Sequence, residues 1–138
     1  MMPYLIGIAV GLVTSLVTWW IGLGRDRAFY PTVLIVVAAY YVLFAAMGGS
    51  GRAVLVESFV MVGFGVVAAV GFRGNLWLVA AGLIGHGVFD VFHVRLALTT
   101  STPPWWPAFC MAADVALGGF LVLLLKRQML SATIGAPA

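Results

Sequence analysis

Five segments that are almost wholly apolar follow one another along this chain of 138 residues. Each is close to the ~20 residues that an α-helix needs to cross the hydrocarbon of a bilayer. The residues are 64% hydrophobic and only 8% charged, which is too few polar side chains to cover a soluble domain of this size. The sequence therefore predicts an all-α integral membrane protein, with spans at residues 4–23, 31–47, 53–72, 76–98 and 107–125.

The connections between these spans are short and contain residues that end helices. Pro31 suits the first turn of a helix, where its missing N–H costs nothing, and glycines or a Pro-Pro pair interrupt the chain at later connections. Short connections make consecutive helices antiparallel neighbours. We therefore predict one compact five-helix transmembrane domain over residues 1–127 and a short flexible tail over residues 128–138.

Basic residues are distributed unequally between the two ends of this predicted bundle. Arg52 and Arg95 lie at one end, and five basic residues lie at the other: Arg25, Arg27, Arg73, Lys126 and Arg127. The positive-inside rule then predicts an N-terminus outside and a C-terminus in the cytoplasm. The basic residues form no long run, so the sequence does not indicate nucleic-acid binding.

Ionisable side chains inside the spans are the feature that indicates a functional site. A charged group in hydrocarbon costs ~2.5–3.5 kcal/mol even on insertion scales, so such residues usually have a function and a partner. The i, i+4, i+7 spacing on the fourth span aligns its three ionisable residues on one helical face. All five groups lie in the predicted outer half of the bilayer, and we expect them to converge on one site; they are Glu57, His86, Asp90, His93 and Asp114.

Imidazoles and carboxylates are suitable ligands for a divalent transition metal such as Zn or Fe. In this hypothesis His86, Asp90 and His93 bind the metal directly, and Asp114 and Glu57 complete or orient the set. A metal with an open position could activate water or oxygen beside a lipophilic small molecule.

The same residues also suit acid/base catalysis without a metal. His86 would then be the catalytic base, and Asp90 would orient it. In either hypothesis Tyr40 or Tyr41, only one of which can face inward, would donate a hydrogen bond to substrate or ligand. The sequence does not decide whether the protein is an enzyme.

Two alternatives need no catalysis. The Asp and His side chains could form a path for protons or cations in a small transporter or accessory subunit. They could also form a hydrogen-bond network that only fixes helix packing. A retinal Schiff base is excluded because no Lys lies inside a span, and C-x-x-C redox chemistry is excluded because the chain has one Cys.

Small residues suggest where helices approach one another closely. Gly7-x-x-x-Gly11, continued by Ser15, predicts a tight contact that could serve the bundle itself or a homodimer. Cys110 is interpreted mainly as a small packing residue, with a metal thiolate as the less favoured alternative.

Three stretches carry a resemblance to a known family. They are residues 28–37 (AFYPTVLIVV), 85–93 (GHGVFDVFH) and 104–110 (PWWPAFC), the last followed by Asp114. With these motifs the chain resembles a family of short bacterial integral membrane proteins of unknown function. The resemblance implies residence in a bacterial inner membrane as a multi-pass protein, and it implies no substrate.

Overall fold

The computed structural model describes residues 1–96 and 101–133, and within α4 it describes side chains as far as His93. The described chain forms five α-helices and a 3₁₀ turn, η1. Each of the five helices is long and apolar enough to cross a membrane, which confirms the predicted all-α class and number of spans. The elements are α1 (Met2–Trp20), η1 (Leu23–Arg25), α2 (Phe29–Met47), α3 (Gly51–Arg73), α4 (Leu76–Leu96) and α5 (Trp106–Lys126).

Local chemistry explains where the helices begin and end. α1 stops before the predicted residue 23 because Gly22 takes a φ of +92°, in the left-handed region that favours glycine. The Ser50 hydroxyl accepts a hydrogen bond from the Ala53 N–H and so caps the start of α3. The Asn75 side chain does the same for Trp77 at the start of α4. The predicted last residues of the fourth span, 97 and 98, lie outside the described residues.

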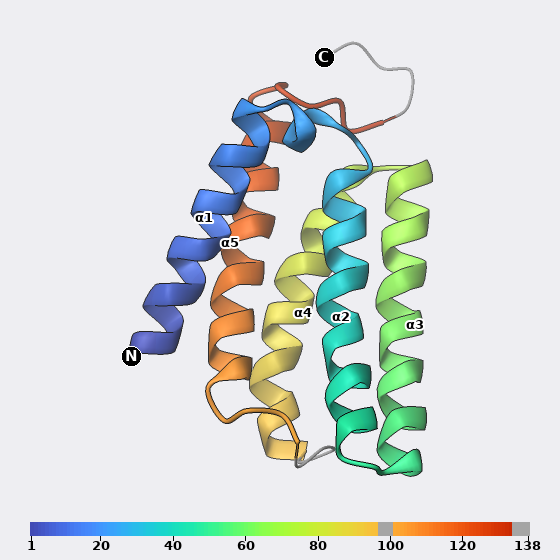
Figure 1. Ribbon diagram of the computed structural model, residues 1–138. Helices are drawn as coiled ribbons and strands as arrows, with labels where there is room; N and C mark the ends of the chain where they lie inside the picture. Colours follow the sequence, from blue (N-terminus) through green and yellow to red (C-terminus); the bar gives the residue numbers. More distant parts are fainter. Residues whose placement is uncertain (97–100, 134–138) are drawn as a thin grey trace.

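The helices pack as a bundle in which α5 lies between α1 and α4, with α2 and α3 beyond α4 (Figure 1). Consecutive helices are neighbours from α2 to α5, as the short connections predict. α1 differs, because it packs along α5 instead of α2 and runs in the same direction as α5. Connection length alone therefore does not determine the partner of α1.

The contact between α1 and α5 depends on small residues. Gly7, Gly11 and Ser15 are the buried residues of α1. A Cβ atom on Gly11 would lie 2.7 Å from the carbonyl oxygen of Ala113, and one on Gly7 would overlap the carbonyl oxygen of Phe109. The predicted small-residue contact is thus made inside the bundle, where it lets two backbones approach closely.

At the end of the bundle that holds η1, one arginine connects three segments of the chain: the first connection, the end of α3 and the segment after α5. The Arg27 guanidinium donates to the carbonyl oxygens of Phe72 at 2.8 Å, Gly74 at 3.0 Å and Ala132 at 2.8 Å. Ala132 also accepts a 2.9 Å hydrogen bond from the Leu76 N–H. Residues 128–133, which the sequence places in a flexible tail, are therefore held against this end, while 134–138 lie outside the described residues.

The interior of the bundle changes character along its length. The apolar core lies toward the η1 end and is built from α2, α3, α4 and α5, with Leu34, Leu76, Leu83, Leu121 and Leu124 among its members. The outward faces expose large apolar side chains, as expected of a surface in contact with lipid. The opposite half of the interior holds the ionisable residues.

Candidate functional site

All five ionisable residues predicted to form a site are buried. Their exposed fractions run from 0% to 3%, so each is shielded from lipid and from water. The stripe on α4 does face the interior, as its spacing predicts. The five residues do not surround one point, however; they form two separate groups.

The larger group, which we name the α4–α5 cluster, contains His86, Asp90, Cys110 and Asp114. One donor atom from each residue lies within 4.8 Å of the donor atoms of the other three. His86 Nδ1 is 2.7 Å from Asp114 Oδ2 and 3.8 Å from Asp90 Oδ2. The Cys110 thiol donates to Asp114 Oδ2 at a sulfur–oxygen distance of 3.6 Å.

The close approach of α4 and α5 brings these short side chains together. Each helix contributes two residues at i and i+4, which stack on one face. Gly87 of α4 lies against α5, where an added Cβ would be 3.0 Å from the carbonyl oxygen of Met111. Gly118 of α5 lies against α4 in the same way, 3.2 Å from the carbonyl oxygen of Ala80. With the backbones this close, Asp and Cys side chains reach across the interface.

The smaller group is the Glu57–His93 pair. His93 Nε2 lies 2.7 Å from Glu57 Oε1, so this contact joins α4 to α3 and not to α5. The separation from His86 follows from helix geometry, because seven residues at ~1.5 Å each displace His93 by ~10 Å along the axis. Neither His93 nor Glu57 is among the donor atoms that lie within 4.8 Å of one another, so in the structure the five-residue ligand set of the sequence hypothesis divides.

Tyr41 connects the two groups. Its hydroxyl donates to Asp90 Oδ1 at 2.6 Å, and its ring stacks on His93 with ring centroids 3.9 Å apart. Tyr40 points elsewhere and packs its ring against Trp106, with centroids 4.9 Å apart. Of the two tyrosines that the sequence offered, Tyr41 is therefore the one that reaches the buried polar residues.

Several polar atoms in these groups have no hydrogen-bond partner within the described residues. They are Glu57 Oε2, His86 Nε2, Asp90 Oδ2 and Asp114 Oδ1. Unpaired buried polar atoms are expensive, and two carboxylates beside one imidazole would carry net negative charge if ionised. The cluster therefore needs protons or a bound cation to be stable in this apolar setting.

The spacing of the α4–α5 cluster fits a small cation. Tetrahedral ligands bound at ~2.0–2.3 Å lie ~3.3–3.8 Å from one another. The distances from His86 Nδ1 to Asp90 Oδ2, 3.8 Å, and from Cys110 Sγ to Asp114 Oδ2, 3.6 Å, match this spacing. The 2.7 Å contact between His86 and Asp114 must widen, and the remaining pairs, which lie within 4.8 Å, must draw closer where they exceed the range. The four residues could thus hold a metal ion after a small adjustment.

Cys110 is the member that sequence analysis placed mainly in packing. The structure buries its thiol to 3% exposure and sets it against Asp114. The signal was present in the i, i+4 spacing of the two residues on one helix. What the spacing did not reveal is that this face of α5 turns toward α4.

The cluster also suits proton transfer without a metal. In that arrangement a carboxylate holds one ring nitrogen of a histidine while the other nitrogen stays free to accept a proton. Asp114 is closer to His86 Nδ1 than Asp90 is, at 2.7 Å against 3.8 Å. The residue that orients His86 is therefore Asp114 on the neighbouring helix, where the sequence hypothesis had Asp90.

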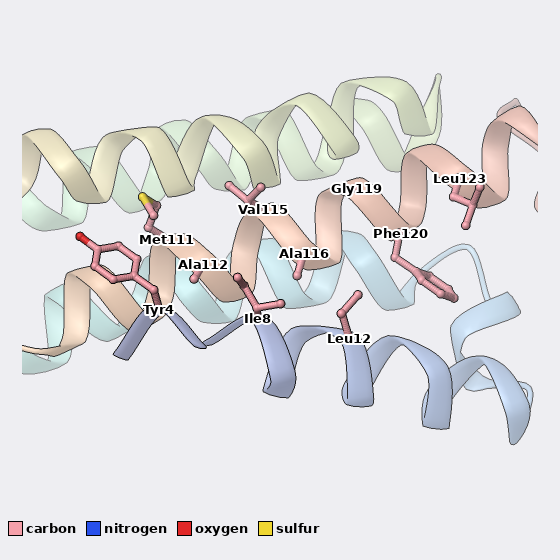
Figure 2. A pocket seen from close by; sticks show the side chains of 10 residues that line it. All are labelled: Tyr4, Ile8, Leu12, Met111, Ala112, Val115, Ala116, Gly119, Phe120 and Leu123. Atoms are coloured by element: carbon pink, nitrogen blue, oxygen red, sulfur yellow. The ribbon is translucent and has the colours of Figure 1, made fainter. Parts of the chain in front are cut away.

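A surface hollow lies on the other side of α5. It has a volume of about 490 Å³ between α1 and α5, and Ile8, Leu12, Ala112 and Ala116 face into it (Figure 2). Apart from the Tyr4 hydroxyl its side chains are apolar, and none of its lining residues belongs to the α4–α5 cluster or the Glu57–His93 pair. The hollow and the buried polar groups are separate features.

Comparison of the chain with models of protein families, with curated proteins and with solved structures finds no match.

Proposed function

We propose that this multi-pass membrane protein binds one divalent transition metal ion, Zn²⁺ or Fe²⁺, in its α4–α5 cluster. The observation that carries the proposal is the convergence of four buried metal-binding side chains, from two adjacent helices, within 4.8 Å. Glu57 and His93 then lie outside the ligand set, and Tyr41 orients the ligand Asp90 through its hydrogen bond.

The donor types favour a transition metal over Mg²⁺ or Ca²⁺. A thiolate and an imidazole are softer ligands than the oxygen atoms that those two ions prefer. A divalent ion would also offset the negative charge of Asp90, Asp114 and the Cys110 thiolate, which otherwise stand in an apolar interior. Both the chemistry and the charge of the site therefore support this class of ion.

With four protein ligands, a metal ion here would act as a Lewis acid only if its shell expands to a fifth position for substrate or water, among apolar side chains. Such an ion polarises a bound oxygen or lowers the pKa of a bound water. Because the outward faces of the helices are apolar, the substrate class that we propose is a lipophilic small molecule dissolved in the bilayer. The lipid bilayer is the surrounding partner.

The proposed orientation has the N-terminus outside and the C-terminus in the cytoplasm of a bacterial inner membrane. Arg25, Arg27 and Arg73 are at the same end of the bundle as the end of α5, and Arg52 is at the opposite end. This asymmetry supports the orientation through the positive-inside rule. The side chain of Arg95, the second basic residue predicted at that opposite end, lies outside the described residues.

Elemental analysis of the purified protein tests the metal proposal. We expect about one transition-metal ion per chain in the unmodified protein and little in His86→Ala or Asp114→Asn, since each variant removes a ligand. His93→Ala is the matched control, because it removes the same residue type from the same helix but not from the cluster. Protein that takes up no stoichiometric metal on incubation with Zn²⁺ or Fe²⁺, or equal loss in His93→Ala, would contradict the proposal.

A second candidate function is metal-free acid/base catalysis on the same class of substrate. The observation that favours it is His86 itself, which is held at Nδ1 by Asp114 and has no partner at Nε2 among the described residues. Metal-free protein from the elemental analysis would favour this function. A proton flux into liposomes that Asp90→Asn abolishes would instead favour the third function, a proton path through the bundle.

A further inference from the structure

One nitrogen of His86 faces away from the α4–α5 cluster. Nδ1 is directed at Asp114 on α5, and the two ring nitrogens of an imidazole project in nearly opposite directions. Nε2 therefore points away from α5, and it is buried without a hydrogen-bond partner among the described residues. A polar atom in this position is available to a ligand that approaches from the side of His86 away from α5.

Three aromatic rings pack around His86. The nearest is Phe64 of α3, whose ring meets the imidazole edge-on with centroids 4.8 Å apart. Phe89 and Tyr41 lie farther away, at centroid distances of 6.1 and 6.2 Å. Phe64 is only partly buried, while the His86 side chain that it contacts is 0% exposed, so the Phe64 ring contacts both the buried imidazole and the outer surface of the bundle.

The backbone around Phe64 is not tightly packed. Gly63 and Gly65 flank it on α3, and a Cβ added to either would meet no atom within 4 Å. Gly85, next to His86 on α4, is equally free of neighbours. Glycine destabilises a helix relative to alanine, and at these positions close packing does not require it. Gly87 of α4 differs, because α5 fills the space beside it.

We infer that Phe64 is a lateral gate through which a small lipophilic molecule enters from the bilayer and reaches His86 Nε2. The glycines on either side let α3 yield locally so that the Phe64 ring can turn aside. At the end of this path the imidazole nitrogen is a buried polar atom with no partner among the described residues, and the rings of Phe64, Phe89 and Tyr41 pack around it. The ligand class is therefore an apolar molecule with a single hydrogen-bonding group, such as a carbonyl or hydroxyl.

This inference rests on the proposed function for the substrate class, but the path can be tested without a metal or a substrate. Diethyl pyrocarbonate is a small apolar reagent that transfers an ethoxycarbonyl group to an unprotonated imidazole nitrogen and releases ethanol and carbon dioxide. Protein in lipid nanodiscs would be treated with the reagent, and the rates of modification of His86 and His93 would be measured separately by mass spectrometry.

Phe64→Ala should raise the rate at His86 roughly three- to tenfold, the factor that corresponds to losing one aromatic pair. Phe59→Ala is the matched control, since Phe59 is on the same helix, is 70% exposed and faces away from His86. His93 is the internal control, and its unchanged rate shows that the bundle has not loosened as a whole. An equal rate at His86 in the unmodified protein and Phe64→Ala would overturn the gate.

A second variant tests the glycines without removing the ring. Gly63→Ala combined with Gly65→Ala has room for both methyl groups and stiffens the helix, so it should lower the rate at His86. A rate that stays the same or rises would contradict the role of these glycines. The series is run on chelator-treated protein, because a metal ion bound at Nδ1 would leave the proton on Nε2 and block the reaction there. The metal content of untreated protein is measured independently, which distinguishes failure of the gate from failure of the metal site.

Discussion

The α4–α5 cluster and the Glu57–His93 pair are two solutions to the same problem, a histidine buried inside a membrane bundle. In the pair, one imidazole meets one carboxylate, and within the described residues no second acid approaches it. In the cluster, His86 has two carboxylates within 3.8 Å and a thiol beside one of them. The pair is matched in charge, while the cluster has an excess of acidic groups.

This difference separates a structural role from a binding role. The pair joins one imidazole to one carboxylate and fixes α3 against α4, as interhelical hydrogen bonds commonly do in membranes. A group with more acceptors than donors gains a stable state only when a cation or protons are added. We therefore expect ligand binding to depend on the cluster and the packing of α3 to depend on the pair.

Metal-linked stability should show the largest effect. At a free Zn²⁺ concentration of about 100 times its dissociation constant, binding to the folded state adds ~2.7 kcal/mol to the free energy of unfolding. Denaturant titration followed by tryptophan fluorescence should show this gain in the unmodified protein and in Glu57→Gln. Asp114→Asn should show little gain, and a full gain in that variant would remove the distinction between the two groups.

Removing one acid from each group should have the next largest effect. In chelator-treated protein we expect Glu57→Ala to cost ~2 kcal/mol of unfolding free energy, because His93 is left buried without its partner. Asp114→Ala should cost nearer ~0.6 kcal/mol, the average for an interhelical hydrogen bond in a membrane, because Asp90 remains near His86. Combining Asp114→Ala with Asp90→Ala should cost more than the sum of the two, and simple additivity would show that neither acid replaces the other.

Tyr41 connects the two groups, so its hydroxyl should have an intermediate effect. Tyr41→Phe keeps the ring stacked on His93 but loses the hydrogen bond to Asp90, and we expect a cost of ~1.5 kcal/mol. Loss of an outer hydrogen bond of this kind also weakens metal binding by about tenfold or more. Tyr40→Phe is the matched control, and an equal change in both variants, measured by unfolding and by metal titration, would contradict the assignment.

Cys110→Ser should have the smallest effect on stability. The hydroxyl is slightly smaller than the thiol and can donate the same hydrogen bond to Asp114, so we expect a change of about 0.5 kcal/mol in chelator-treated protein. Cobalt-loaded protein provides a sharper measurement, since a thiolate bound to Co²⁺ gives a near-ultraviolet charge-transfer absorption that a hydroxyl does not. An identical spectrum in Cys110→Ser would place the thiol outside the ligand set.

The helices themselves could be predicted well from sequence, because the need to satisfy backbone hydrogen bonds in lipid leaves few alternatives to a long apolar helix. The structure differs mainly at the ends, where a left-handed Gly22 shortens α1. The partner of α1 could not be predicted, because Gly7 and Gly11 indicate a close contact without indicating which helix makes it.

The sequence correctly predicted that the five ionisable residues are buried, but it did not predict which of them contact one another. The stripe on α4 correctly faced inward, yet neighbours on one stripe contact different helices once the axial rise between them exceeds the reach of a side chain. Asp114 rather than Asp90 is closest to His86 because α5 packs closely on α4 at Gly87, and no local pattern in α4 encodes that.

The choice between the two tyrosines was not within reach of the sequence, because α2 is apolar on every face. The buried residues of α2 recur every three or four positions and include Leu34, Ala38, Tyr41 and Ala45. Tyr40 lies off this face. The inward face of α2 is therefore visible only in the structure, whereas the ionisable residues of α4 mark its inward face in the sequence.

The Arg27 contacts have a consequence for how the protein is made. Arg27 lies in the first connection of the chain, yet two of the carbonyl oxygens that it binds belong to Ser131 and Ala132. The ribosome synthesises those two residues after all five helices. The hydrogen bonds from the Arg27 guanidinium to their carbonyl oxygens can therefore form only after the helices have been made. Attachment of Ser131 and Ala132 to the connection between α1 and α2 is therefore a late step in biogenesis.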